Sequence, residues 1–219
     1  MSKYKAVMFD LDGTLLDTIE DLTDAMNEAL AACGLATHTV QECKYFVGDG
    51  VRNFALRSLP TESRDEATLT RVVTLYRNAY ARNWDAKTRP YEGVETLLDE
   101  LFTRGLQVVV YSNKPDEFTG LTIRKLLPRW PFAAVVGARD GWAHKPDPAA
   151  ALDIAGRLGI APADFVYVGD TNTDMQTATA AGMYAVGALW GFRTAEELRT
   201  HGARVLIAHP MELLKVLDA

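Results

Sequence analysis

The sequence predicts an α/β protein with a doubly wound, mostly parallel sheet and a small all-helical domain inserted after the first strand. Two observations support this prediction. Short apolar runs alternate with helical patterns along most of the 219 residues, which is typical of a parallel sheet covered by helices on both faces. Between residues 17 and 89 this alternation stops, and only helical patterns are found. We therefore expect a core formed by residues 1–16 and 90–219 and a helical domain at 17–89.

Six runs rich in β-branched and aromatic residues are expected to form the strands of the sheet. They span residues 5–9, 106–111, 132–136, 164–168, 183–187 and 203–207. The stretches between them have helical spacing and are expected as helices at 93–104, 115–126, 148–158, 172–181, 194–200 and 210–217. Gly105, Gly159 and Gly182 come just after three of these stretches, where a left-handed residue commonly ends a helix.

The region from 17 to 89 has apolar residues at helical spacing. The first predicted helix has on one face Ile19, Leu22, Met26, Ala29, Leu30 and Cys33. A second, long helix is expected from Ser63 to Trp84. Tyr76, Tyr80 and Trp84 are expected to lie in the core of this domain rather than to contact a ligand.

Composition excludes several classes of protein. The formal charge of −6 argues against a general binder of nucleic acid or of anionic membranes. No run approaches the roughly 18–20 apolar residues of a membrane helix, and the N-terminus lacks the apolar core of a signal peptide. Two cysteines, Cys33 and Cys43, favour a reducing, cytoplasmic setting. The four histidines lack zinc-binding spacing.

Polar residues follow three of the predicted strands, and they form the candidate site. The strands are followed by Asp10-Leu11-Asp12-Gly13-Thr14, by Ser112-Asn113-Lys114 and by Gly169-Asp170-Thr171-Asn172-Thr173-Asp174. Ligands of open parallel sheets bind at the carboxyl ends of the strands, so these clusters would share one crevice if their strands are neighbours. Each cluster also has a purely structural interpretation, such as an Asx turn, a helix cap or the capping box of Thr171 and Asp174.

Closely spaced carboxylates such as Asp10 and Asp12 repel each other, and burial makes the repulsion worse. A positive charge is therefore expected beside them. Lys145, in the segment His144-Lys145-Pro146-Asp147-Pro148, is one candidate, although a solvated lysine in a proline-rich turn is the simpler interpretation of that segment alone.

The four pieces, in this order, resemble the haloacid dehalogenase superfamily of phosphotransferases, which would have a Rossmann-like core and an inserted cap. The resemblance covers essentially the whole chain. It is closest to the phosphoglycolate phosphatase branch, on the segments Phe46-Val47-Gly48-Asp49-Gly50-Val51, Ser112-Asn113-Lys114, Lys145-Pro146 and Leu189-Trp190-Gly191-Phe192. An Asp at position 12 favours a phosphatase over a dehalogenase, because a dehalogenase has no leaving alcohol to protonate.

The resemblance implies a magnesium-dependent phosphatase that works through an aspartyl-phosphate. Asp10 would be the nucleophile and Asp12 the general acid and base. Mg²⁺ would be held by the Asp10 carboxylate, the Asp12 backbone carbonyl and Asp170, with Asp174 binding directly or through a water.

The phosphoryl group would be bound by Ser112, Asn113 and Lys145. Residues 17–89 would form a mobile cap, in which Arg52 could pair with a substrate carboxylate or be a solvated arginine. The expected substrate is a small-molecule phosphomonoester, and the chain is expected as a monomer or homodimer.

A pyrophosphatase, a nucleotidase and a sugar phosphomutase are alternatives on the same scaffold, and a non-catalytic phosphate-binding regulator is a more distant one. Residues of the predicted cap would decide among them.

Overall fold

The computed structural model describes residues 3–139 and 141–219, and within them the chain divides into two compact units. One unit contains the residues up to Leu16 together with Pro90–Ala219, and the other contains Asp17–Arg89. The chain passes between the units at two short strands, β2 (Leu16–Asp17) and β3 (Arg89–Pro90), which form a two-stranded sheet.

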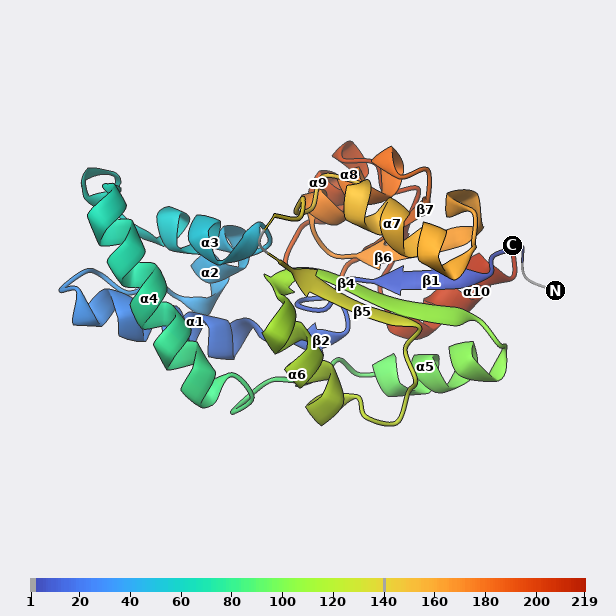
Figure 1. The fold of residues 1–219 in the computed structure, drawn as a ribbon, viewed down its shortest axis with the longest axis horizontal. Coiled ribbons are helices and arrows are strands. Elements are labelled where there is room, and N and C mark those ends of the chain that lie inside the picture. The colour runs from blue at the N-terminus through green and yellow to red at the C-terminus, as the bar shows by residue number, and fades with distance from the viewer. Residues whose placement is uncertain (1–2, 140) are drawn as a thin grey trace. The chain divides into compact units, whose positions relative to one another are not determined.

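The larger unit is built on a parallel sheet, as the sequence predicts (Figure 1). Across the described residues, six strands lie in the order β5-β4-β1-β6-β7-β8, and neighbouring strands pair in parallel. Their bounds are β1 Ala6–Phe9, β4 Gln107–Pro115, β5 Ala134–Ala138, β6 Phe165–Gly169, β7 Tyr184–Ala188 and β8 Val205–Ile207. The predicted α/β fold class is confirmed.

Helices cover both faces of the sheet (Figure 1). Successive residues of β1 alternate between two apolar cores, Val7 and Phe9 in one and Ala6 and Met8 in the other. Helices α5 (Val94–Thr103), α6 (Asp116–Leu126) and α10 (Leu213–Leu217, after the short turn Pro210–Glu212) contribute to the first core. Helices α7 (Ala149–Leu158), α8 (Asn172–Ala180) and α9 (Ala195–Thr200) contribute to the second, and the short turn Pro162–Asp164 precedes β6. Strands β1 and β6 are buried along their whole length, which explains why they are uninterrupted apolar runs.

Three strands have boundaries that differ by two or more residues from those expected. Strand β4 continues through Ser112, Asn113 and Lys114 to Pro115, although these residues are expected after a strand that ends at residue 111. The pairing of β4 with β5 is irregular between Tyr111 and Pro115, so the polar residues extend the strand past its regular ladder. Strand β5 is shifted two residues toward the C-terminus, and strand β8 begins two residues later than expected.

The smaller unit is helical. Its helices are α1 (Ile19–Ala32), α2 (Val40–Phe46), α3 (Gly50–Ser58) and α4 (Glu66–Asn83), with a short turn at Thr61–Ser63. Helix α4 begins three residues later than expected, because the Asp65 carboxylate accepts a hydrogen bond from Thr68 N–H at 2.9 Å and caps the helix.

Aromatic packing forms part of the core of the smaller unit. The rings of Tyr76 and Tyr80 stack with centroids 5.7 Å apart, and Phe54 meets Tyr76 edge-on at 5.6 Å. Trp84 is also buried. Among the described residues, none of the helices has both the length and the apolar character to cross a membrane.

Candidate active site

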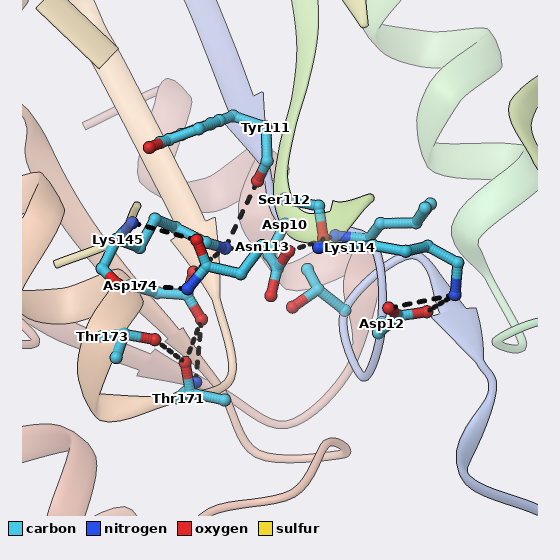
Figure 2. Close-up of polar contacts among 12 residues, drawn as sticks. Asp10, Asp12, Tyr111, Ser112, Asn113, Lys114, Lys145, Thr171, Thr173 and Asp174 are labelled. Atoms are coloured by element: carbon cyan, nitrogen blue, oxygen red, sulfur yellow. Dashed lines mark hydrogen bonds and ion pairs between the residues drawn. The ribbon is translucent and has the colours of Figure 1, made fainter. Parts of the chain in front are cut away.

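The three polar clusters lie at one edge of the sheet because their strands are neighbours. Strand β1 pairs with β4 on one side and with β6 on the other. Asp10 follows β1, Ser112–Lys114 end β4, and Asp170 follows β6. The carboxyl ends of parallel strands share an edge, so residues more than a hundred positions apart in the sequence come together there (Figure 2).

A tight turn after β1 presents the two aspartates. The Asp10 N–H continues the sheet by donating to Val168 O at 3.0 Å, and the Asp10 carboxylate accepts from Leu11 N–H at 2.7 Å. Gly13 has a φ of +87°, a conformation that side chains with a Cβ rarely adopt. Its N–H donates to Leu16 O at 2.9 Å and closes the turn. The turn therefore needs a glycine immediately after Asp12.

Asp170 is held by hydrogen bonds from two other loops. Its carboxylate accepts from the Thr14 hydroxyl and from Phe192 N–H, both at 2.8 Å. A Cβ on Gly13 would lie 2.3 Å from the Asp170 carboxylate, and one on Gly191 would lie 2.3 Å from its Cβ. The Asp170 side chain thus occupies space that only two glycines leave open.

Lys145 joins two of the carboxylates. Its ammonium lies 2.9 Å from Asp10 Oδ1 and 2.7 Å from Asp174 Oδ1, and its side chain is 1% exposed. Asp174 also accepts hydrogen bonds from Thr171, through its N–H at 3.0 Å and its hydroxyl at 2.6 Å, and from the Tyr167 hydroxyl at 3.3 Å. The capping box of α8 is therefore present, and the same Asp174 carboxylate also orients Lys145.

Three carboxylates gather around this lysine. Asp10, Asp170 and Asp174 each offer one oxygen, and these oxygens lie within 4.8 Å of one another. All three residues are buried. One ammonium cannot balance three carboxylates, and hard oxygen donors in this number suit a divalent ion such as Mg²⁺.

Burial and mutual repulsion raise the pKa of two of these acids. Burial, followed by the charge of Asp174, raises the pKa of Asp10 to about 7, although Lys145 opposes the shift. Burial and the charges of Asp174 and Asp10 raise the pKa of Asp170 well above its ordinary value. Burial alone would lower the pKa of Lys145, but Asp10 and Asp174 outweigh it and hold that pKa well above the usual range.

These shifts predict that the metal-free protein loses stability as the pH rises from about 5 to about 7.5. In that window the folded protein keeps a proton on Asp10 that the unfolded chain has lost, so the free energy of unfolding falls with rising pH. The shift of Asp170 has the same sign. Thermal unfolding in a chelator, followed across this window, measures the effect.

Added Mg²⁺ is expected to raise the melting temperature more at the upper end of this range than at the lower end, because a metal site needs ionised carboxylates. A metal-free melting temperature that rises with pH, or a Mg²⁺ effect that is independent of pH, would contradict the shifts.

Asn113 lies close to the site, and its side chain contacts the backbone of Lys145. Its side-chain amide donates to Lys145 O at 3.1 Å, and its side-chain oxygen accepts from Lys145 N–H at 2.9 Å. These two bonds fix the backbone that carries Lys145. The Ser112 hydroxyl accepts from Lys114 N–H at 3.2 Å and is buried at the same edge.

Asp12 pairs with a second lysine, a contact that sequence analysis did not predict. The Lys114 ammonium lies 2.9 Å and 3.2 Å from the two carboxylate oxygens of Asp12. Lys114 is only 6% exposed. The side chain of Asp12 is not among the three that could together hold a metal ion, so the two aspartates of the turn have different partners.

Arg52 lies in the helical unit, near the start of α3. Its guanidinium makes two hydrogen bonds with the Glu66 carboxylate, at 3.0 Å and 2.6 Å. Both side chains are more than half exposed, and such surface pairs contribute little to stability.

The chain is similar in sequence to proteins of one hydrolase family. The family model described as haloacid dehalogenase-like hydrolase matches residues 7–188. A phosphoglycolate phosphatase of Xylella fastidiosa (strain 9a5c) is 36% identical over 194 residues, which are 88% of this chain and 83% of that protein. Phosphoglycolate phosphatase 1 of Pseudomonas aeruginosa is 30% identical over 218 residues, 98% of this chain and 80% of the relative.

Solved structures agree with these matches. A protein of Lactobacillus delbrueckii subsp. bulgaricus, provisionally assigned as a phosphoglycolate phosphatase, has a TM-score of 0.92 and 31% identity over 99% of both chains. A hydrolase of Pseudomonas syringae has a TM-score of 0.78 and 27% identity over 98% of both. The chain therefore belongs to the haloacid dehalogenase-like hydrolase family and is a phosphatase.

Proposed function

We propose that the protein hydrolyses 2-phosphoglycolate, with Mg²⁺ as its metal, through an aspartyl-phosphate on Asp10. The observation that carries the proposal is the arrangement at the sheet edge, where Asp10 meets Lys145, Asp170 and Asp174 within one buried cluster. The curated relatives named as phosphoglycolate phosphatases support the choice of substrate.

In the first step, a carboxylate oxygen of Asp10 attacks phosphorus while the bond to the ester oxygen breaks. Asp12 gives its proton to the departing alcohol oxygen. In the second step, Asp12 takes a proton from a water that attacks phosphorus, and the bond to Asp10 breaks. One aspartate must be ionised to attack while its neighbour exchanges a proton, which gives a reason for two carboxylates on one turn.

The other residues would neutralise negative charge and position the reacting groups. Lys145 would neutralise Asp10 and the phosphoryl oxygens, Ser112 would donate to the phosphoryl group, and Asn113 would fix the Lys145 backbone as well as contribute to phosphate binding. The carboxylates of Asp10 and Asp170 and the Asp12 carbonyl would hold Mg²⁺. Asp174 would hold it less directly, because its oxygens already accept from Lys145 and Thr171. Bound Mg²⁺ supplies positive charge for the phosphoryl oxygens.

The cap role of residues 17–89 and the carboxylate contact of Arg52 remain predictions. A substrate carboxylate would have to replace Glu66 as the partner of Arg52, at little cost because the pair is exposed. Both cysteines are free thiols, which is compatible with the cytoplasmic setting that we propose. The choice between monomer and homodimer is also still a prediction.

The test is phosphate release by the purified protein. We expect turnover of 2-phosphoglycolate with Mg²⁺, loss of turnover in a chelator, and lower kcat/KM for pyrophosphate, nucleoside monophosphates and sugar phosphates. Failure to release phosphate from any phosphomonoester would refute the proposed reaction, whereas a preference for pyrophosphate or a nucleotide would refute only the substrate.

Gly191 provides a separate prediction about Asp170. Gly191→Ala is expected to displace the Asp170 carboxylate, because the new Cβ would lie 2.3 Å from the Asp170 Cβ. Moving a residue that positions a metal ligand costs about 10- to 100-fold in metal affinity or activity. Titration of Mg²⁺ by calorimetry and the Mg²⁺ concentration for half-maximal activity measure the loss.

The matched control is Gly156→Ala, in α7, where a Cβ would meet nothing within 4 Å. It is expected to leave Mg²⁺ affinity unchanged. Equal affinity in the two variants would remove Asp170 from the proposed metal site.

A further inference from the structure

The buried lysine at the end of β4 has no role in the mechanism above. Lys114 is 6% exposed, and its ammonium bonds to both oxygens of Asp12, at 2.9 Å and 3.2 Å. A buried ion pair contributes little net stability, because taking both charges out of water offsets most of their attraction. The stability of the fold therefore does not by itself explain why a lysine occupies position 114.

The two lysines of the site serve different aspartates. Lys145 contacts Asp10 and Asp174, which lie where phosphorus would be attacked. Lys114 contacts Asp12, the residue proposed to protonate the leaving oxygen. In Figure 2 the Lys145 and Lys114 ammonium groups lie on opposite sides of the view, with Asp10 between them. One positive charge thus lies beside the proposed nucleophile, and the other lies beside the proposed general acid.

The proton transfer fixes how close the leaving group must come. The ester oxygen has to lie within about 2.6–3.2 Å of an Asp12 oxygen to receive its proton. The Lys114 ammonium lies at a similar distance from the same carboxylate. A group attached one carbon from the ester oxygen therefore falls within reach of Lys114.

We propose that Lys114 is a substrate-binding residue that recognises an anionic group next to the ester oxygen, here the carboxylate of 2-phosphoglycolate. This inference rests on the proposed function. A negative substrate group beside Asp12 would otherwise face a carboxylate, and an ammonium between two carboxylates turns that repulsion into attraction. Lys114 lies within the larger unit, so its contact with the substrate would act in addition to the one predicted for Arg52.

The test compares 2-phosphoglycolate with ethyl phosphate, in which a methyl group replaces the carboxylate. We expect the wild-type kcat/KM to be at least about 50-fold higher for 2-phosphoglycolate, the range of a hydrogen bond between charged groups. In Lys114→Met the ratio of the two kcat/KM values is expected to fall at least about tenfold, mainly through KM for 2-phosphoglycolate. Lys114→Arg keeps the charge and is expected to recover part of the ratio.

Lys5→Met is the matched control, because Lys5 also pairs with an aspartate, Asp164, but is 67% exposed and precedes β1. It is expected to leave the ratio unchanged. Thermal unfolding of each variant checks that it is folded.

Equal losses on both substrates in Lys114→Met would overturn the inference, and so would a wild-type enzyme that does not discriminate between them, a result that needs no variant. A larger loss on pyrophosphate than on 2-phosphoglycolate would overturn the assignment to a carboxylate. These results leave the phosphatase reaction standing, whereas a wild-type protein inactive on every phosphoester refutes the proposed function itself.

Discussion

Replacing Asp10 with asparagine is expected to lower kcat for 2-phosphoglycolate at least about 10⁴-fold, the scale of losing a covalent nucleophile. The amide cannot form the phosphorus–oxygen bond that the carboxylate forms. It also removes one of the three oxygens that cluster within 4.8 Å. Steady-state phosphate release, and single-turnover reactions quenched in acid, measure the loss.

Two further variants separate the proposed roles of the paired aspartates. Asp12→Asn is expected to lower turnover by about 10²- to 10⁴-fold, yet still to form an acid-stable label on Asp10 from a substrate with a good leaving group. Asp99→Asn is a control on the surface, where Asp99 pairs with Arg129, and is expected to retain full activity. Turnover that survives in Asp10→Asn, or a label that still forms there, would rule out Asp10 as the nucleophile.

The second large effect is expected for Lys145→Met. Removing the ammonium leaves Asp10 and Asp174 buried without their shared partner, and breaking a buried pair in this way costs about 3–5 kcal/mol. Turnover is expected to fall about 10²- to 10³-fold because a charge aimed at the phosphoryl oxygens is lost. Urea unfolding in a chelator and steady-state kinetics measure the two effects separately.

The double variant Lys145→Met/Asp174→Asn distinguishes stability from catalysis. Neutralising Asp174 is expected to restore part of the free energy of unfolding but none of the turnover. The control Lys87→Met removes a lysine that pairs with Asp24 at the surface, with its side chain 46% exposed, and is expected to change stability by less than about 1 kcal/mol. If Lys145→Met unfolds at the same urea concentration as the wild type, the buried pair does not have the proposed energetic role.

Much of the larger unit could be predicted because its central strands β1 and β6 are buried on both faces. The runs Ala6–Phe9 and Phe165–Gly169 therefore consist almost entirely of apolar residues, a pattern that predicts buried strands. The end of a strand was harder to predict where polar residues extend the strand. Ser112–Lys114 lie inside β4, but their side chains belong to the candidate site and not to the apolar core. The apolar pattern therefore ends before the strand does.

Contacts within the site could be predicted only where the order of strands and polar clusters along the sequence indicates them. Proximity of Asp10 and Asp170 follows from strand ends at one edge of the sheet, which the strand order bears out. The pairing of Lys114 with Asp12 and the clamp of Asn113 on Lys145 join residues 102 and 32 positions apart. These contacts depend on side-chain directions at the edge of the sheet, which spacing along the chain does not specify.

The most direct test of the proposed chemistry is a crystal structure of the protein with Mg²⁺ and beryllium fluoride, which mimics a phosphoryl group on a carboxylate. The proposal predicts beryllium fluoride bonded to Asp10, and one metal ion about 2.1 Å from carboxylate oxygens of both Asp10 and Asp170. Beryllium fluoride on another residue, or a metal ion that contacts Asp170 but not Asp10, would contradict it.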